Sequence, residues 1–269
     1  MQLYYQCYPN SDGDNTEPAI DSRPPLLIIP GLFGSTTNWR SVAKRLGNDY
    51  PVWVIDQRNH GRSPQAPSNT YTDMCEDLVA FMDHHGLISI ILCGHSMGGK
   101  VAMLFALLYP ERVTALIVLD IAPVAYNHSH APFLEELMSI DLSSLKSRSE
   151  ADRALQAVIP ETGTRLFLLQ NLAGTSGQYY WRINLAVLHQ YMDHMIGFPM
   201  ALVENSQFLN EVLVIVGEES DYVKAADHSI VLKLFEKARF ASISGAGHWL
   251  HADQPDAVID SVSSFLSDL

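Results

Sequence analysis

The pentapeptide GHSMG at residues 94–98 constrains this chain of 269 residues more than any other feature. It follows an apolar run at residues 87–93 that predicts a buried strand, and it precedes an apolar-periodic stretch at residues 100–108 that predicts a helix. Glycines two positions before and after the serine permit a sharp strand-to-helix turn, where larger side chains would not fit. The pentapeptide alone is a weak signal. Between a strand and a helix, it predicts a nucleophile elbow that exposes the hydroxyl of Ser96.

Short apolar strands alternate with helical patterns along most of the chain. This alternation predicts an α/β fold, with a mostly parallel sheet covered by helices on both faces. The predicted strands are residues 2–8, 26–29, 52–55, 88–93, 113–119, 212–216 and 239–243. The predicted helices are residues 39–46, 72–85, 100–109, 225–235 and 255–266. The polar residues 11–25, which include several prolines, predict a loop or an irregular hairpin.

The alternation stops between residue 120 and about residue 210, where helical patterns follow one another. These patterns lie at residues 133–139, 149–158, 163–172 and 183–196. An insertion of this length inside a compact domain is expected to be structured and often functional. We therefore expect a first core part at residues 1–120, a helical cap at residues 121–210, and a second core part at residues 211–269. The cap is predicted to form much of the acyl pocket.

A serine hydroxyl becomes a good nucleophile only when a base takes its proton, and a third group must orient that base. Among the 11 histidines, His248 is the candidate base. It lies in a loop between the last predicted strand and the last predicted helix. That loop falls at the carboxyl edge of a parallel sheet, which is also the edge where Ser96 is expected.

Two aspartates compete for the third position. Asp120 ends the strand at residues 113–119 among apolar neighbours, where a buried carboxylate needs a strong partner such as the Nδ1–H of His248. Asp221 follows the strand at residues 212–216. Both preserve the order Ser, Asp, His, so chain order does not choose between them. The apolar surroundings favour Asp120, whose alternative role is to cap the start of the helical insertion.

A glycine-rich turn, PGLFGS at residues 30–35, follows the predicted strand at residues 26–29. It predicts a backbone N–H, from Leu32, aimed at the oxyanion that develops on the substrate. The N–H of Met97, directly after the nucleophile, would complete the oxyanion hole. Phe33 is predicted to contact the substrate. The segment DQRNHGRS at residues 56–63 is predicted to shape a turn and to hold neighbouring loops by hydrogen bonds.

Composition limits the partners of the chain. The net charge of −13 argues against nucleic acid or an anionic membrane bound through a broad basic face. No apolar run approaches the roughly 18 residues of a membrane helix, and the N-terminal residues do not resemble a secretory signal, so a cytoplasmic protein is expected. The three widely spaced cysteines suggest reduced thiols. Neither a metal nor an organic cofactor is expected.

Together these motifs resemble the α/β-hydrolase superfamily over nearly the whole chain. They are most similar to a subgroup of small bacterial serine esterases that has a mitochondrial relative. The segments that carry the resemblance are GLFGS at residues 31–35, DQRNHG at 56–61, GHSMGG at 94–99, DIAP at 120–123, WRINL at 181–185 and GHWLH at 247–251. The resemblance implies a cap inserted after the strand at residues 113–119, the sixth in the usual numbering of that fold. It also implies an acid after the same strand, which supports Asp120.

The resemblance further implies a serine carboxylesterase acting on short-to-medium acyl esters, or on acyl-CoA thioesters, through an acyl-enzyme. The chain departs from the family at Pro30, where many relatives have a histidine that braces the oxyanion turn. It also departs at the acidic pair Glu218 and Glu219, whose effect is not predicted. Arg182 is expected either to meet an anionic part of the substrate or to form a salt bridge within the cap.

Other functions use a similar arrangement of residues. C–C bond hydrolysis, lactone hydrolysis and cofactor-free perhydrolysis rely on comparable triads, and a non-catalytic ligand-binding protein could keep the same fold. Haloalkane dehalogenation and epoxide hydrolysis are disfavoured because they need an aspartate where this chain has Ser96. The physiological substrate, the acyl length and the choice between monomer and homo-oligomer stay open.

Overall fold

The computed structural model describes residues 1–8, 23–127 and 129–269, so most of the loop predicted at residues 11–25 lies outside the described residues. Seven strands form one sheet in the order β1-β3-β2-β4-β5-β8-β9. Their bounds are β1 Tyr5–Tyr8, β2 Leu26–Ile29, β3 Val52–Ile55, β4 Ile90–His95, β5 Val113–Leu119, β8 Glu211–Gly217 and β9 Ala238–Ile243. β1 pairs antiparallel with β3, and all other neighbouring strands of this sheet are parallel.

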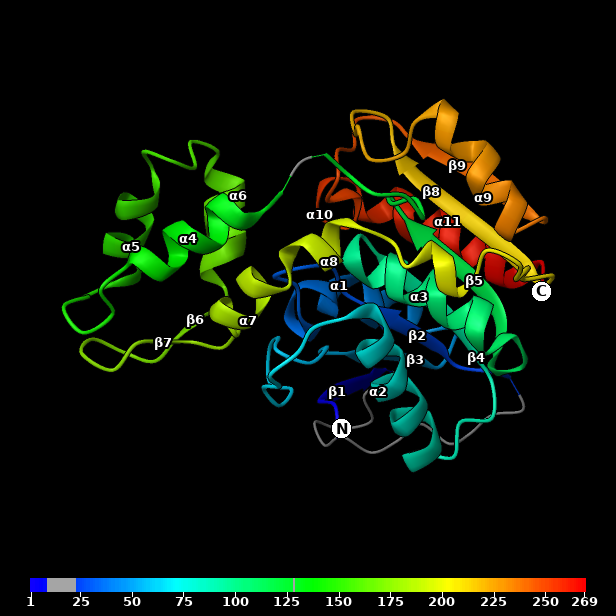
Figure 1. Ribbon diagram of the computed structural model, residues 1–269, viewed down its shortest axis with the longest axis horizontal. Coiled ribbons are helices and arrows are strands. Elements are labelled where there is room, and N and C mark those ends of the chain that lie inside the picture. The colour runs from blue at the N-terminus through cyan, green and yellow to red at the C-terminus, as the bar shows by residue number, and fades with distance from the viewer. Residues whose placement is uncertain (9–22, 128) are drawn as a thin grey trace.

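Helices cover both faces of this sheet (Figure 1). One face carries α2 (Tyr71–His84), α3 (Met97–Leu108) and α9 (His228–Leu234), and the other carries α1 (Thr36–Leu46), α10 (Leu250–Asp253) and α11 (Pro255–Ser267). Alternate residues of β5 feed the two cores, with Leu116 and Val118 on the first face and Ile117 and Leu119 on the second. Strands buried on both faces explain the continuous apolar runs. The predicted α/β-hydrolase architecture is confirmed.

The segment between β5 and β8, which we call the cap, is mainly helical. Its helices are α4 (Ala131–Ser139), α5 (Arg148–Leu155), α6 (Thr162–Leu169), α7 (Leu185–Gln190) and α8 (Met192–Ile196). A short hairpin of β6 (Leu172–Ala173) and β7 (Tyr180–Trp181) separates α6 from α7. In Figure 1, α4 to α6 and this hairpin form a lobe beside the sheet domain. The division into domains at residues 120 and 210 remains a prediction.

Three of the expected cap helices were wrong in their extent. The helix predicted at residues 149–158 ends at Leu155. The helix predicted at residues 163–172 ends at Leu169, because Leu172 and Ala173 pair with β7 instead. The pattern at residues 183–196 is split into α7 and α8, and α7 begins only after Asn184, whose side chain accepts from the N–H of Val187 at its first turn. The spacing of apolar residues in the sequence does not indicate where these helices end or divide.

The core strands follow the prediction more closely. β2, β3 and β5 have the predicted bounds, whereas β1 begins at Tyr5 instead of residue 2 and β4 continues to His95. In the described part of the chain β5 is the fifth strand, although the usual numbering of the fold calls it the sixth. The extension of β4 matters for function because it carries the strand up to the residue before Ser96.

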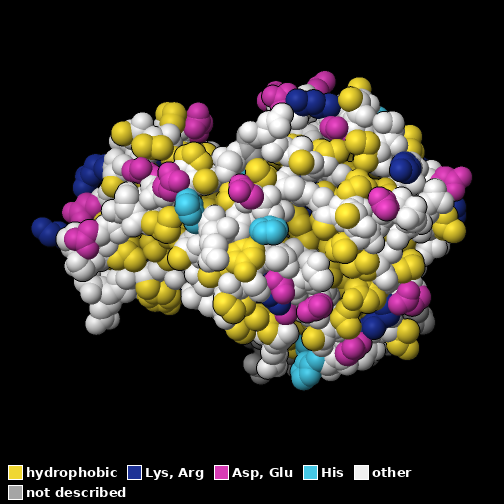
Figure 2. All heavy atoms as spheres, viewed as in Figure 1, with side chains coloured by type: hydrophobic (Ala, Val, Ile, Leu, Met, Phe, Trp, Pro, Cys, Tyr) yellow, Lys and Arg dark blue, Asp and Glu magenta, His cyan; other side chains and the backbone are white. Residues whose placement is uncertain are grey.

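The surface agrees with the acidic composition. In Figure 2 acidic side chains are spread over both the cap and the sheet domain, as the net charge of −13 leads one to expect. Among the described residues, no helix combines the length and the apolar character that crossing a membrane requires.

Candidate active site

Ser96 lies at the turn between β4 and α3, in a backbone conformation that L residues rarely adopt. Its φ is +52° and its ψ is −121°. The flanking glycines have no room for a side chain, since a Cβ on Gly94 would lie 2.3 Å from the carbonyl oxygen of Gly98, and a Cβ on Gly98 would lie 2.3 Å from that of Ile29. The N–H of Ser96 donates to the carbonyl of Leu119 at 3.1 Å. The strained turn is therefore built into the sheet.

Ser96, His248 and Asp120 form one hydrogen-bonded chain. His248 Nε2 lies 2.9 Å from Ser96 Oγ, and His248 Nδ1 lies 2.7 Å from Asp120 Oδ2. Asp120 directly follows β5, is fully buried and has a φ of +51°, and His248 lies in the loop between β9 and α10. The structure thus brings the three predicted residues together in the order that a nucleophile, a base and an orienting acid require. Asp221, the alternative acid, is exposed.

The buried carboxylate of Asp120 has further hydrogen-bond donors. The N–H of Gly217 donates to Oδ1 at 3.1 Å, and the hydroxyl of Ser220 donates to Oδ2. These donors offset the cost of burying the charge. Sequence reasoning assigned no role to Ser220.

Two rings hold the imidazole and the loop of His248. The Tyr222 ring stacks on it, with centroids 3.6 Å apart and planes 14° from parallel. Nε2 of His95 donates to the carbonyl oxygen of His248 at 2.7 Å, because a carbonyl oxygen can only accept. Burial holds the pKa of His95 well below its usual value, so this donor is a neutral imidazole. Both contacts restrict the orientation of His248 toward Ser96.

The glycine-rich turn at residues 31–34 lies directly against the nucleophile. It is closed by the N–H of Gly34, which donates to the carbonyl of Gly31 at 3.0 Å, and Phe33 within it has a φ of +64°. A Cβ on Gly31 would lie 3.0 Å from the Cβ of Ser96, a contact tighter than most, so glycine favours this close approach. Leu32 lines the same cavities as Ser96, and its role as an oxyanion donor stays a prediction. Met97 opens α3, where the first N–H groups have no partner within the helix.

Side chains from two distant segments brace this turn. Gln57 Nε2 donates to the carbonyl of Pro30 at 2.9 Å, and the buried Asn171 of the cap donates through Nδ2 to the carbonyl of Phe33 at 2.9 Å. A second N–H of the same amide reaches the carbonyl of Leu168 at 3.2 Å. These contacts hold the turn that follows Pro30 without a bracing histidine at that position. Nothing in the local sequence pointed to Asn171.

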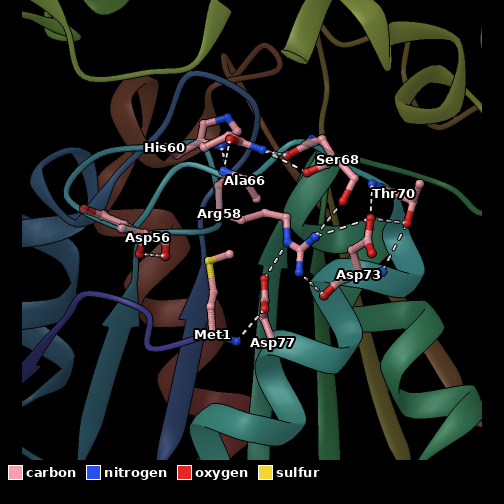
Figure 3. A network of polar contacts seen from close by, with 12 residues as sticks. Met1, Asp56, Arg58, His60, Ala66, Ser68, Thr70, Asp73 and Asp77 are labelled. Atoms are coloured by element: carbon pink, nitrogen blue, oxygen red, sulfur yellow. Dashed lines mark hydrogen bonds and ion pairs between the residues drawn. The ribbon is translucent and has the colours of Figure 1, made fainter.

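The DQRNHGRS segment is buried and densely hydrogen-bonded, in keeping with the structural role predicted for it. Figure 3 shows Arg58 between two acidic residues of α2, with Nε donating to Asp77 Oδ2 at 2.6 Å and Nη2 donating to the carbonyl of Asp73 at 3.0 Å. His60 contacts the carbonyl of Arg58 through Nδ1 at 2.9 Å, and burial lowers its pKa to about 4. His60 lines neither of the cavities that reach Ser96.

Two cavities meet at the nucleophile and share Leu32, Ser96 and His130 in their linings. The first has a volume of about 380 Å³, and its other lining residues include Tyr71, Met97, Lys100, Ile121, Tyr126, Met192, Met195 and Tyr222. The second has a volume of about 360 Å³, and its other lining residues include Phe33, Phe133, Thr164, Phe167, Leu168, His248 and Trp249.

The two residues predicted to bind substrate have different positions. Phe33 is buried and lines the second cavity. Arg182 lies outside the linings of both cavities, and its backbone N–H donates to the carbonyl of Asn171 at 2.9 Å. The guanidinium of Arg182 forms no ion pair with another described residue.

Comparison with known proteins gives consistent results. A family model described as the α/β-hydrolase fold matches residues 24–255. The chain is 38% identical over 264 residues to the sn-1-specific diacylglycerol lipase ABHD11 of Mus musculus, covering 95% of this chain and 83% of that protein. It is 34% identical over 245 residues to Esterase YbfF of Escherichia coli, covering 91% and 93%. A solved marine microorganism esterase superposes with a TM-score of 0.88 at 36% identity, covering 98% of this chain and 99% of that one.

Proposed function

This chain belongs to the α/β-hydrolase family, and we propose that it is a serine carboxylesterase acting through an acyl-enzyme. The observation that carries the proposal is the hydrogen-bonded chain from Ser96 through His248 to Asp120, placed at the junction of two cavities. Relatives named as esterases and as a diacylglycerol lipase support chemistry on ester bonds.

The proposed reaction has two halves. Ser96 Oγ attacks the acyl carbonyl carbon while its proton passes to His248 Nε2, 2.9 Å away. The N–H groups of Leu32 and Met97 stabilise the negative oxygen, and Asp120 stabilises the imidazolium. His248 then protonates the leaving alcohol as the carbon–oxygen bond breaks. In the second half His248 takes a proton from water as the water oxygen attacks the acyl carbon. The bond between that carbon and Ser96 Oγ then breaks, His248 returns the proton to Oγ, and the carboxylic acid leaves.

The experiment that tests this proposal is hydrolysis of p-nitrophenyl esters from acetate to palmitate by the wild type and by Ser96→Ala. Labelling with a fluorophosphonate serine probe runs in parallel. Turnover and labelling that both depend on Ser96 support the proposal. Absence of turnover together with absence of labelling would overturn it in favour of a ligand-binding protein. Labelling without ester turnover would instead favour C–C bond hydrolysis, lactone hydrolysis or perhydrolysis by the same triad.

Three further parts of the proposal come from the sequence alone. They are the activity on acyl-CoA thioesters, the cytoplasmic location and the independence from metals and organic cofactors. The same panel with acyl-CoA substrates addresses the first. Assay of the enzyme after exhaustive treatment with a chelator addresses the third, and we expect undiminished turnover.

A further inference from the structure

We infer that Lys100 is a positioning residue, which holds both chain connections of the cap against α3 and thereby fixes a wall beside Ser96. The wall belongs to the cavity of about 380 Å³ that Met97 and Lys100 line, which we call the inner cavity. It consists of α8 and the residue after it, Gly197, and we call it the α8 wall. The kinetic part of this inference rests on the proposed esterase function.

Lys100 lies in the first turn of α3, and its side chain is almost completely buried. The N–H of Lys100 donates to the carbonyl of Ser96 at 3.1 Å, so its backbone belongs to the turn that follows the nucleophile. Only 1% of Lys100 is exposed. Burial of an ammonium group is costly unless protein acceptors replace the hydrogen bonds to water. A lysine at this position therefore needs acceptors, whereas a hydrocarbon side chain would need none.

The acceptors come from both connections between the cap and the sheet domain. Nζ of Lys100 donates to the carbonyl of Val124 at 2.8 Å, in the segment that leads from β5 into the cap. It also donates to the carbonyls of Ile196 at 2.8 Å and Gly197 at 2.6 Å, where α8 ends. These bonds use the three N–H groups of the ammonium, and they satisfy carbonyls that have no partner within α8. One side chain of α3 thus joins the beginning of the cap to its end.

The two connections also contact each other at the same point. The N–H of Tyr126 donates to the carbonyl of Ile196 at 3.0 Å, which is a carbonyl that Lys100 binds. Nζ lies 4.6 Å from the ring centroid of Tyr126. The hydroxyl of Tyr126 donates to the carbonyl of Tyr222 at 2.7 Å, and the Tyr222 ring stacks on His248. The contacts of Lys100 are therefore continuous with those that hold the proposed base.

The α8 wall is one short helix thick, and it lies beside the start of α3 (Figure 1). On one side, three of its residues line the inner cavity together with Ser96: Met192, Met195 and Ile196. On the other side, three of its residues line a surface groove of about 690 Å³: Asp193, His194 and Gly197. A helix of five residues has little stability of its own, so its position depends on contacts with the rest of the protein. Lys100 supplies two such contacts, and the hydroxyl of Tyr71 supplies another by donating to the carbonyl of Met195 at 2.6 Å.

This geometry predicts which kinetic constant depends on Lys100. Nζ donates to main-chain carbonyls and not to Ser96, His248 or Asp120, so its loss leaves the reacting groups in place. A displaced α8 wall loses contacts with the part of the substrate that occupies the inner cavity. Those contacts are made in the ground state and in the transition state alike. Loss of such uniform binding raises KM and leaves kcat nearly unchanged.

The kinetic test is Lys100→Met, which has a similar side-chain length and no N–H group. The substrate is p-nitrophenyl hexanoate, which has an apolar group on each side of the ester. Burial lowers the pKa of Lys100 to about 7, so the assay is run at pH 6, where the amine carries its proton. We expect KM to rise about tenfold or more, the scale for loss of hydrogen bonds from a charged donor, with kcat per fluorophosphonate-labelled site within about threefold of the wild type. Lys100→Arg keeps a cation with N–H donors and should have a KM below that of Lys100→Met.

Hydrogen exchange tests the position of the α8 wall without any need for turnover. We expect the amides of residues 192–197 to exchange about tenfold faster or more in Lys100→Met than in the wild type, with β4 and β5 unchanged. Arg112→Met is the matched control. Arg112 also donates to two carbonyls, of Ile88 at 3.0 Å and Leu87 at 3.1 Å, but at the edge of the sheet where β4 and β5 begin. This control should leave both KM and the exchange of α8 unchanged.

The outcomes separate failure of this inference from failure of the esterase proposal. An unchanged KM or an unchanged exchange of α8 in Lys100→Met overturns the positioning role, and so does a fall in kcat at constant KM. Lys100→Gln replaces Lys100→Met if the latter does not fold. It retains fewer N–H donors than lysine on a shorter side chain, and the same two criteria apply. Faster exchange of α8 in a protein whose wild type hydrolyses no ester overturns the esterase function and leaves the structural role of Lys100 standing.

Discussion

The turn that carries Ser96 lies against the glycine-rich turn at residues 31–34, which we call the oxyanion turn. Different contacts stabilise the two turns. Each contains a non-glycine residue with positive φ, +52° at Ser96 and +64° at Phe33. The elbow is stabilised by its own strand, its own helix and the N–H bond from Ser96 to Leu119 of the adjacent strand β5. The oxyanion turn is braced by Gln57 of the core and by Asn171 of the cap.

The two proposed oxyanion donors, the N–H groups of Leu32 and Met97, therefore depend on different parts of the molecule. The N–H of Met97 is placed by the elbow and α3 alone. The N–H of Leu32 depends on a turn whose unfavourable backbone conformation persists only when surrounding contacts enforce it. The cap supplies one of those contacts, so we expect it to affect the proposed chemistry as well as the shape of the cavities.

Removal of the nucleophile should have the largest effect. Ser96→Ala deletes the hydroxyl and leaves the elbow, the cavities and the oxyanion turn in place. Because removal of one triad member removes the function of the whole triad, we expect kcat to fall by about 10⁴-fold or more. The measurement is p-nitrophenyl butyrate hydrolysis. A residual rate above about 5% of the wild type contradicts the assignment of Ser96.

The two candidate acids should differ strongly. Asp120→Asn replaces the carboxylate that orients His248 with a neutral amide that can also donate, and an equivalent change in a serine protease costs about 10⁴-fold in kcat. Asp221→Asn alters an exposed side chain and should leave kcat within about twofold of the wild type. Both variants are assayed over a range of pH. The opposite ranking would move the acid to the loop after β8.

Loss of the cap brace should have an intermediate effect on catalysis. Asn171→Leu removes both N–H bonds of the side-chain amide and frees the carbonyl of Phe33. Loss of a whole oxyanion donor costs about 10² to 10³ in kcat, so displacement of one donor should cost about tenfold. KM should change little, because the donor acts on charge that develops in the transition state.

Asn184→Leu is the matched control for Asn171→Leu. Asn184 also belongs to the cap and also donates to the core, to Asn59 Oδ1 at 3.2 Å, but it does not contact the oxyanion turn. We expect a loss of thermal stability in both variants and a fall in kcat per labelled site only in Asn171→Leu. Equal kcat in the two variants would show that the cap merely covers the site.

The smallest expected effect is on the pH dependence of the unfolding free energy, through the buried His251. His251 stacks on Trp39 with ring centroids 4.3 Å apart, and burial lowers its pKa from 6.5 to about 3. The unfolded chain therefore binds a proton below pH 6.5 that the folded protein does not bind until about pH 3. Unfolding free energy should accordingly fall as the pH decreases from 6.5 toward 3.

The test replaces the imidazole with a ring that does not titrate. His251→Phe should retain the stacking on Trp39 and reduce the slope of unfolding free energy against pH by up to about 1.4 kcal/mol per pH unit. Urea unfolding at pH 7, 6 and 5 measures this slope. An unchanged slope would assign the acid sensitivity to other buried groups such as His60, whose pKa is also lowered, to about 4.

Prediction from sequence succeeded where local patterns decide structure. β2, β3 and β5 have their predicted bounds because runs of β-branched and leucine residues between turn signals specify strands buried on both faces. The turn at Ser96 could also be predicted, because Gly94 and Gly98 have no room for a Cβ and only glycine fits there. The structure of the cap was harder to predict from the sequence. Its β6–β7 hairpin is two residues long on each side, too short for periodicity to reveal.

Spacing and local steric limits were enough to predict the fold class, Ser96 as the candidate nucleophile and the short list of its candidate partners. Tertiary structure decided what depends on contacts between distant segments. It placed Asp120, and not Asp221, against His248, added Ser220 to the carboxylate, and joined Asn171 to the oxyanion turn. Such hydrogen bonds link residues about 100 or more positions apart. Their geometry arises only when the sheet and the cap pack together, because no local pattern encodes which distant polar group will satisfy a buried one.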